Sequence, residues 1–424
     1  MFERPSVMAS CSPRRMVAQS ALAVLVMFGL SGSIRAGELR SFGNDSQTGT
    51  SQAVRVGGLS LIQTTQLLAI DQQSLVVAAG DIGEQTRYVL KLADDVLQTQ
   101  GTSLAHAVKL NVYLARSSDR AAVDAILAKQ FTGEVRPAAC FVTTSLPKAG
   151  CLVGLDVIAA RPTLKDGPSH AIRLARYPGP ERHAAALPVG ARVYVSGQAE
   201  KGEDLAVATR ATLASLRKTL EFLGLQSRDV VQVKSFVNPK SVLGAGAASS
   251  HRADIDVVRG EVSKFFGADV PPLAFVDWSL PLIEIELVVA AGPERDGAAI
   301  EYLTPPGMSA SPIFARVTRI NRGPTIFLSG QYGNDRSDAT REVESLFQEM
   351  EQLLKLSGSD LRHMAKATYY VASDDTSKSL NAVRPKIYDP QRPPAASKAV
   401  VLGAGRTDRD IVIDMIAVPS SESR

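Results

Sequence analysis

A pattern that recurs three times along the chain constrains the fold more than any other feature. Two short apolar runs end in Ser-Gly-Gln, at residues 192–198 and 325–331, and a weaker copy that ends in Gly lies at 74–80. An apolar run of this length that ends in Gly is typical of a strand that stops at a tight turn. We therefore expect three strands of this kind, each of which begins the same succession of elements.

The spacing of later landmarks supports the repeat. Each copy has a helical pattern that ends in Gly, and the next predicted strand ends 13 residues further on. These pairs are Gly101 and Leu114, Gly224 and Val237, and Gly358 and Val371. The interval from this Gly to the Pro that opens a later strand is 36 residues in copies one and three and 48 in copy two. A Gly/Ala/Ser-rich stretch at 242–250 accounts for the difference, and we expect it to be an inserted loop.

The sequence thus predicts three tandem domains, at 54–162, 163–298 and 299–420. The expected order in each is β-β-α-β-α-β-β, which is an α+β domain with two helices on one face of a mixed sheet. Strands such as 157–159 and 285–289 are apolar on both faces, so the second face of each sheet also needs to be buried. We expect the three sheets to pack together as an intramolecular pseudo-trimer that is monomeric in solution.

The first 36 residues have the pattern of an export signal. Arg14 and Arg15 precede an apolar run at 16–30, and small residues follow up to Ala36. This pattern predicts a cleaved signal peptide and a periplasmic or secreted protein without a stable membrane span. An uncleaved anchor and a twin-arginine signal are the open alternatives. Residues 37–53, rich in Ser, Thr, Gly and Gln, are expected to be a flexible lead-in.

Composition excludes several classes of function. The net charge is +4 over 424 residues, and no basic run with interleaved aromatic residues predicts a nucleic-acid surface. No His, Cys and carboxylate residues have metal-ligand spacing, so neither a metal nor another cofactor is expected. Cys140 and Cys151, the cysteines beyond the signal, form either one disulfide or two buried thiols.

These motifs together resemble the RidA family, also called YjgF, whose members include enamine/imine deaminases and proteins described as endoribonuclease L-PSP. The resemblance rests on the Ser-Gly-Gln turns, the helix that ends in Gly, the Pro-Ala stretches, Leu146-Pro147 and residues 283–286. It implies three tandem RidA-like domains with the chorismate-mutase-like fold. Family members are usually homotrimers with sites between subunits, so the chain is similar to such a trimer fused into one molecule.

The resemblance also implies which residues form the sites. Three acids stand where the family has the carboxylate that positions the attacking water, namely Asp156, Glu286 and Asp414. The turns and their neighbours are the candidate ligand-binding residues: Ser196, Gly197, Ser329, Gly330, Tyr332 and Cys140. A carboxylate is suited to this role because it can orient a water molecule or accept its proton.

The sequence departs from the family at one important point. In the family, an Arg two residues after the Pro of the Pro-Ala stretch holds the substrate carboxylate, and none of the three copies has it. The copies begin at Pro137, Pro272 and Pro394. Since a guanidinium grips a carboxylate through two charge-assisted hydrogen bonds, its loss weakens the case for deamination. Arg136, Arg392 and Lys398 are the nearby cations that remain candidates to replace it.

Three functions remain as hypotheses. The protein binds a small metabolite in clefts between its domains, it hydrolyses an imine or enamine there with one of the three acids, or it is an inactive structural or partner-binding pseudo-trimer. The missing arginines favour binding over classical deamination, and we leave open whether the protein is an enzyme. A ribonuclease activity is disfavoured because no basic groove is predicted.

Overall fold

The computed structural model describes residues 37–162, 173–238, 247–278 and 282–420, which lie in one compact unit of the chain, 36–424. The predicted export signal at 1–36 and residues 242–246 of the predicted loop lie outside these described residues. Helix α4 begins at Ala247, so the remainder of that predicted loop is helical. Among the described residues, no helix combines the length and the apolar content that crossing a bilayer requires.

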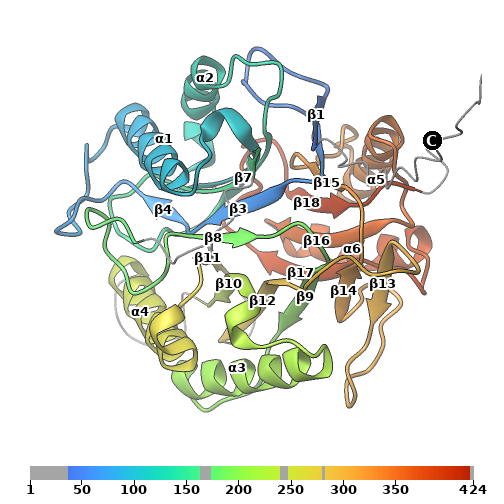
Figure 1. Ribbon diagram of the computed structural model, residues 1–424. Helices are drawn as coiled ribbons and strands as arrows, with labels where there is room; N and C mark the ends of the chain where they lie inside the picture. Colours follow the sequence, from blue (N-terminus) through green and yellow to red (C-terminus); the bar gives the residue numbers. More distant parts are fainter. Residues whose placement is uncertain (1–36, 163–172, 239–246, 279–281, 421–424) are drawn as a thin grey trace, which may run out of the picture. The chain divides into compact units, whose positions relative to one another are not determined.

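The predicted order of elements is confirmed in all three repeats (Figure 1). Repeat one contains β2 (Ala53–Gly57), β3 (Ser60–Thr64), the short β4 (Leu67–Leu68), α1 (Ile82–Thr99), β5 (Ala107–Leu114), α2 (Arg120–Gln130), β6 (Ala138–Thr143) and β7 (Val153–Arg161). Repeat two contains β8 (Ala184–Leu187), β9 (Arg192–Gln198), α3 (Leu205–Phe222), β10 (Val230–Val237), α4 (Ala247–Phe266), β11 (Leu273–Asp277) and β12 (Ile283–Ala290).

Repeat three contains β14 (Val317–Ile320), β15 (Thr325–Leu328), α5 (Ala339–Leu356), β16 (Met364–Val371), α6 (Asp374–Ile387), β17 (Ala395–Val400) and β18 (Ile411–Ala417). Two further strands, β1 (Glu38–Phe42) and β13 (Ile300–Leu303), precede the first strands of repeats one and three. The predicted α+β class is therefore correct.

The first helix of each repeat begins at an aspartate that caps it. Asp81, Asp204 and Asp338 each accept a hydrogen bond from a backbone N–H of the first turn, which satisfies a donor that has no partner within the helix. The predicted glycine stops are also confirmed, because the chain leaves these helices with positive φ angles at the three glycines named above, 74°, 71° and 84° in chain order. Glycine adopts this left-handed conformation without steric cost.

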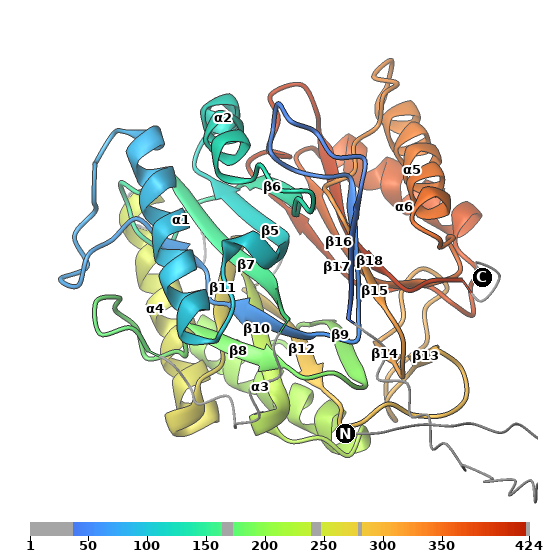
Figure 2. The same cartoon turned by 45° about the horizontal axis from the view of Figure 1, so that its top comes forward.

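Each repeat contributes a sheet whose helices cover one face, as Figure 2 shows. Buried apolar residues form three cores, each centred on one repeat, and the core of repeat one also includes residues of the other two, such as Phe236 and Tyr370. The opposite faces of all three sheets share a fourth core, which includes Ile158, Val288 and Ile416 from equivalent positions on β7, β12 and β18. The prediction that both faces of the sheets are buried is confirmed, and the three sheets are held together by apolar packing.

The three sheets also exchange strands. The sheet orders are β6-β5-β7-β3-β8, β11-β10-β12-β9-β14-β13 and β1-β2-β15-β18-β16-β17, and β4 adds to β7. Thus β8 of repeat two pairs with β3 of repeat one, β14 of repeat three with β9 of repeat two, and β2 of repeat one with β15 of repeat three. Every repeat therefore completes the sheet of another, and backbone hydrogen bonds link them all.

Two predictions about local structure are wrong. Residues 74–80 form a turn, and the strand that corresponds to β9 and β15 is β3. The short apolar run resembled a strand, but Ser74 and Ala78 have positive φ angles that a strand does not allow. Residues 37–53 are not a flexible lead-in, because β1 pairs with β2 along its whole length.

Candidate functional site

The end of β15 contacts repeat one through a serine hydroxyl. Ser329 Oγ accepts a hydrogen bond from Ala139 N at 2.7 Å and donates one to Ser51 O at 2.6 Å. Gly330 N donates to Ala139 O at 2.9 Å. The end of β9 contacts repeat three in the same way, so the two Ser-Gly turns fix two of the seams between repeats.

At the end of β9, Ser196 Oγ accepts from Ala396 N at 2.6 Å and donates to Ala315 O at 2.5 Å. Both candidate serines, Ser196 and Ser329, thus have their hydroxyl groups engaged in joining repeats. The neighbouring glycines leave room at the same seams, since neither has a side chain to place there. Because these hydroxyl groups are already engaged, a ligand at either turn would contact the groups around the turn instead.

The corresponding turn of repeat one closes its seam. Thr65 Oγ1 exchanges hydrogen bonds with the backbone N–H and C=O of Leu273, at 3.1 and 2.9 Å, and thus takes the place of the serines. Gln66 takes the place of the glycine, and its amide donates to Phe275 O at 3.1 Å and accepts from Phe275 N at 3.2 Å. We call this contact between repeats one and two the closed seam. It has no predicted ligand-binding residue, and a buried side chain fills it.

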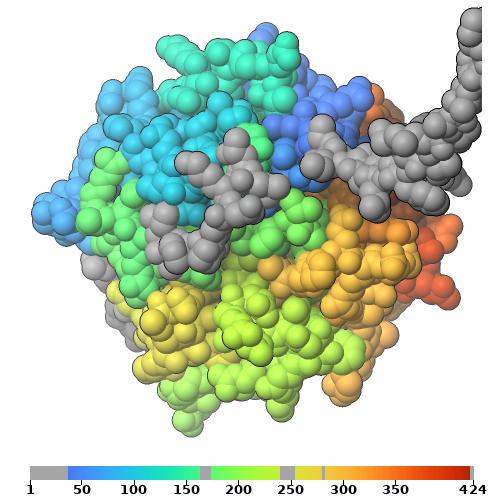
Figure 3. Space-filling view, in the orientation of Figure 1, coloured from blue at the N-terminus to red at the C-terminus, as the bar shows by residue number. Residues whose placement is uncertain are grey.

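A cleft of about 690 Å³ lies at the seam between repeats three and one. Figure 3 shows the side chains of the three repeats abutting over one face of the molecule. We call this space the arginine cleft, after three basic residues in its wall. It is lined by Gly43, Asp45, Thr48, Thr50, Ser51, Gln52, Arg120, Ala139, Ser329, Gly330, Gln331, Tyr332, Asn334, Glu349, Gln352, Leu353, Leu356, Arg406 and Arg409.

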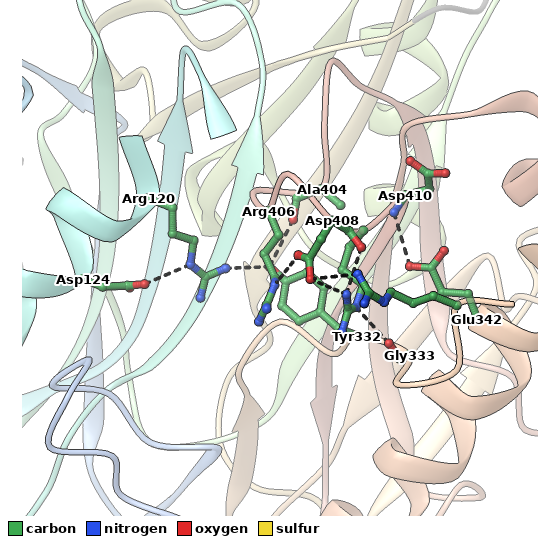
Figure 4. Close-up of polar contacts among 11 residues, drawn as sticks. Arg120, Asp124, Tyr332, Gly333, Glu342, Ala404, Arg406, Asp408 and Asp410 are labelled. Carbon is green, nitrogen blue, oxygen red and sulfur yellow. Dashed lines mark hydrogen bonds and ion pairs between the residues drawn. The ribbon is translucent and has the colours of Figure 1, made fainter. Parts of the chain in front are cut away.

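Arg120, at the start of α2, links the two sides of the arginine cleft. Its guanidinium carbon lies 3.9 Å from the centre of the Phe141 ring. One Nη donates to the hydroxyl of Tyr332 at 2.8 Å, and Nε donates to Asp124 at 3.2 Å (Figure 4). The cation is therefore held by an aromatic face, a phenol and a carboxylate, which fixes its position at the cleft.

Tyr332 lies close to two of the arginines, Arg120 and Arg406. Its hydroxyl donates to Ala404 O at 3.0 Å, and the Arg406 guanidinium lies 5.4 Å from its ring centre. Burial raises the pKa of Tyr332 to about 12, although the nearby Arg120 opposes this shift. The phenol therefore remains neutral at physiological pH and serves as a hydrogen-bonding group in the wall.

Asp408 connects the other two basic residues. It accepts from Arg406 Nε at 3.0 Å and from Arg409 Nη1 at 2.6 Å, and Arg409 Nε donates to Gly333 O at 2.9 Å (Figure 4). These contacts orient the two side chains from the loop between β17 and β18. Arg406 keeps 42% of its side chain exposed, against 10% for Arg409, so Arg406 is the more accessible cation.

The seam between repeats two and three has a different set of groups, which we call the glutamate seam. Gly197 N donates to Ser397 Oγ at 3.1 Å, and Ser397 Oγ donates to Glu286 Oε2 at 2.8 Å. Glu286 also pairs with Lys366 at 2.8 Å. Glu284, two residues earlier on β12, projects from the same face of the strand and hydrogen-bonds to Ser397 as well.

Lys398 completes the glutamate seam. Its Nζ donates to Ser377 Oγ at 3.0 Å and to Asn381 Oδ1 at 3.3 Å. Burial lowers the pKa of Lys398, and Arg384 adds to the effect while Glu284 opposes it. Among the three nearby cations that the sequence offered as replacements for the family arginine, Lys398 is thus the one in a seam beside a Ser-Gly turn. Arg136 contacts the loop carbonyl of Gly133 at 3.5 Å.

The predicted acids are buried rather than open to a cleft. Asp156 accepts from Asn111 at 2.8 Å and from Tyr113 at 2.6 Å. Burial raises its pKa, although Lys234 and these two hydrogen bonds oppose the shift. Its seam is the closed one, so the structure places this acid away from any described cleft.

Asp414 pairs with Lys109 at 2.6 Å, across the boundary between repeats three and one. Burial alone would raise its pKa, but Lys109 and Lys366 reverse the shift and hold the pKa below its usual value. Lys234 interacts electrostatically with Asp156, Glu286 and Asp414. The structure thus brings the three acids together around buried lysines.

Cys140 lies in the wall behind the arginine cleft, where a Cβ on Gly330 would come within 3.2 Å of its sulfur. Cys140 and Cys151 are both free and buried. Of the two alternatives left open by the sequence, the structure therefore has two buried thiols and not a disulfide. Burial raises the pKa of the Cys140 thiol to about 12, which makes it a packing group rather than a nucleophile. The described residues contain no cluster of side chains that could hold a metal ion.

Several site residues were not predicted from the sequence. Arg120, Arg406 and Arg409 belong to no family motif that we identified, and they come from a helix start and a loop, whereas Glu284 lies within the motif at 283–286 but was not named as a site residue. Only the packing of repeat one on repeat three brings the three arginines together. For Glu284, the Ile-Glu-Ile-Glu pattern at 283–286 was a usable signal, because alternate residues of a strand face the same side.

The fold defines a class of tandem α+β domains whose repeats meet at seams, and comparison with known proteins identifies the family. The model of the endoribonuclease L-PSP family matches residues 45–161 and 309–419, more than half of the chain. A RutC family protein of Pyrococcus horikoshii and one of Pyrococcus abyssi are each 33% identical over 109 residues, covering 26% of this chain and 84% of the relative. The chain therefore belongs to the RidA (endoribonuclease L-PSP) family, with repeated domains.

Solved structures are similar over one or several repeats. A YjgF family member from Neisseria meningitidis is 24% identical and covers 29% of this chain and 96% of its own, with a TM-score of 0.22. A chorismatase structure is 16% identical and covers 74% of this chain and 93% of its own, with a TM-score of 0.26.

Proposed function

We propose that the protein binds a small anionic metabolite in the arginine cleft, acting as an exported, monomeric pseudo-trimer. The observation that carries this proposal is the cleft itself, which has a volume of about 690 Å³ and is lined by two fixed guanidinium groups and a Ser-Gly turn. Arg406 is the partly exposed cation, and the guanidinium groups of Arg406 and Arg120 lie 5.4 and 5.8 Å from the centre of the Tyr332 ring. Guanidinium groups bind carboxylates through charge-assisted hydrogen bonds.

Arg120 and Arg406 supply the positive charge that the family places two residues after proline. In this chain Ala139 and Ala396 follow their prolines by two residues, and Leu273 takes the equivalent place in repeat two, as its contact with Thr65 indicates. We infer that a helix and a loop replace the missing strand arginine. The carboxylate of the ligand therefore binds on a different side of the seam from the one where the family arginine lies.

Binding fits the arginine cleft better than hydrolysis does. Asp414, the acid of the same seam, is paired with Lys109 and is absent from the cleft lining. The side chains nearest to Gly330 are those of Val412 and Cys140. A water molecule in the cleft would thus have no carboxylate of the predicted set to activate it. Imine hydrolysis remains the second candidate, and only the glutamate seam joins a predicted acid, Glu286, to a Ser-Gly turn.

The test is calorimetric titration with pyruvate, a stable 2-oxo acid that stands in for an imino acid. Arg406→Gln removes the accessible charge and Arg120→Gln removes the second one. We expect each change to weaken binding roughly 10- to 100-fold, from a loss of about 1.5–3 kcal/mol in charged hydrogen bonds. Arg341→Gln is the matched control, because Arg341 is an exposed residue of α5 paired with Glu344.

Equal affinity in all four proteins would contradict the proposal. Export is tested separately, by locating the full-length protein in fractionated cells. Recovery of a shortened chain outside the cytoplasm supports a cleaved signal at 1–36, and an intact chain in the cytoplasm refutes it.

A further inference from the structure

The arginine cleft is larger than a small carboxylate requires. Its volume of about 690 Å³ lies in the range of pockets that enclose drug-sized ligands, whereas a carboxylate on Arg406 and Arg120 fills only a small part of it. Much of the remaining wall is one face of α5, whose residues recur at three- and four-residue spacing. They are Glu349, Gln352, Leu353 and Leu356. A longer ligand would therefore contact α5 as well as the arginines.

Contacts at the start of α5 show where the arginines lie along this helix. Arg409 Nε donates to Gly333 O at 2.9 Å, and a Cβ on Gly333 would lie 2.8 Å from Ser345 Oγ. In the same loop as the arginines, Asp410 N donates to Glu342 Oε1 at 3.2 Å (Figure 4). The arginine end of the cleft therefore lies beside the first two turns of α5.

Glu349 stands one helical turn further along α5 than Ser345. The two residues are four positions apart in the sequence, and four residues of an α-helix rise by about 6 Å and return to the same side. Glu349 also belongs to the lining of the cleft. A ligand that binds the arginines with one end and extends along α5 therefore brings its other end to the Glu349 carboxylate.

The carboxylate of Glu349 has no hydrogen-bond or ion-pair partner among the described residues. By contrast, Asp45, the other acid of the lining, accepts hydrogen bonds from Gln47 N at 2.8 Å and from Thr48 Oγ1 at 3.0 Å. An unpaired carboxylate repels a simple anion that binds nearby, so Glu349 does not favour such a ligand. The same carboxylate attracts a ligand that carries a positive charge at this position.

We propose that the arginine cleft selects ligands with a carboxylate at one end and an amine or guanidinium at the other, and that Glu349 binds the positive end. This inference rests on the proposed function and names the class of ligand that the site takes. The carboxylate binds Arg406 and Arg120, and the cation pairs with Glu349, so each charge of the ligand meets its opposite. An ω-amino acid with several methylene groups between its charges has this form.

The first test compares ligands that differ only in the amine, by calorimetric titration at low salt. Because Glu349 is partly exposed, its ion pair is weaker than a buried one, and 6-aminohexanoate should bind about 5- to 10-fold more tightly than hexanoate. Glycine, whose charges are too close together to reach both the arginines and Glu349, should bind no more tightly than acetate. Equal affinities for 6-aminohexanoate and hexanoate, or tighter binding of glycine than of acetate, would overturn the proposal.

The second test assigns this preference to Glu349. Glu349→Gln should bind 6-aminohexanoate no more tightly than hexanoate, and it should bind hexanoate at least as tightly as the unaltered protein does, which also shows that the variant is folded. Glu351→Gln is the matched control, because Glu351 lies on α5, pairs with Lys355 and is absent from the cleft lining. A preference that survives Glu349→Gln, or that is lost in Glu351→Gln, would contradict the role of Glu349.

The same titrations separate this inference from the proposed function. Pyruvate and hexanoate carry no amine, so their binding depends on the arginines and not on Glu349, and Arg406→Gln should weaken the binding of both. If both bind and 6-aminohexanoate has no advantage over hexanoate, the role of Glu349 is wrong and the anion-binding function stands. If neither binds, the proposed function is wrong and this inference is refuted with it.

Discussion

The arginine cleft and the glutamate seam are built on the same backbone contacts but carry opposite chemistry. Both place a Ser-Gly turn against the strand that follows a proline. In the arginine cleft a cation from α2, Arg120, covers Phe141 of that strand. In the glutamate seam the strand itself carries the cation, Lys398, and the helix supplies the polar partners Ser377 and Asn381.

The walls of the two sites differ in the same way. Cys140 and Val412 surround Gly330, whereas Ser397 and Glu284 lie at Gly197. Two polar side chains of the glutamate seam therefore stand where the arginine cleft has an apolar wall. The comparison teaches that a fused chain can specialise each seam separately, whereas identical subunits must change all of their sites together.

The largest expected effect concerns the buried ion pair that each of the two sites has behind it. Each is backed by a buried ion pair between repeats, Lys109 with Asp414 and Lys366 with Glu286. Lys109→Met leaves a buried carboxylate without its cation and should cost about 3–5 kcal/mol of the free energy of unfolding. Chemical denaturation measures the loss.

Lys366→Met should have a similar effect, because its partner is equally buried. The double change Lys109→Met with Asp414→Asn should recover part of the loss, since the unpaired charge is then removed as well. A loss below about 1 kcal/mol in both single variants would show that these pairs do not hold the seams together.

A smaller effect tests why the third seam is closed. Gln66→Gly makes repeat one resemble the other two turns and removes two hydrogen bonds to Phe275. The change should cost about 1–3 kcal/mol and open space at the seam. Thermal unfolding gives the cost, and a crystal structure of the variant shows whether the seam opens. A seam that remains filled would mean that Gln66 is not what closes it.

The smallest effect is the pH dependence of stability caused by Glu284. Its pKa is raised from 4.5 to about 8 in the folded protein, so the folded chain keeps a proton that the unfolded chain has released. This contribution is fully present below about pH 4.5 and is lost as pH rises to about 8. Glu284→Gln has no proton to lose, so it should become more stable relative to the unaltered protein between pH 5 and pH 9.

Melting temperatures of the two proteins across this range provide the measurement. The Glu284→Gln variant keeps Lys398 and Lys366, so the contributions of these two residues are common to the two curves. Parallel curves would show that Glu284 releases its proton at the same pH in the folded and unfolded states.

The fold could be predicted from the sequence because its signals are local and repeated. Caps such as Asp81 and stops such as Gly101 act within a few residues, and three copies with equal spacing confirm one another. The prediction of a strand at 74–80 was wrong for the same reason, because it rested only on the apolar composition of that segment. The exchange of β2, β8 and β14 between sheets has no local signal, because a strand that pairs with a distant repeat resembles one that pairs with its neighbour.

The sites could be predicted only where a motif marks them. The Ser-Gly turns at 196–197 and 329–330 do lie at seams, and Lys398 does lie beside one. Arg120 and Arg406 are 286 positions apart, and neither has a spacing that points to the other. Tyr332 meets both because repeat three folds against repeat one, so this part of the site depends on tertiary packing that no local pattern encodes.

The most direct test of the central claim, that the seams are not equivalent and that an anion binds at one of them, is a crystal structure of the protein soaked with pyruvate. We expect pyruvate in the arginine cleft, with its carboxylate on Arg406 and Arg120 beside Tyr332, and no pyruvate in the closed seam. Equal occupancy of all three seams, or an arginine cleft without pyruvate at a concentration that saturates binding in solution, would contradict it.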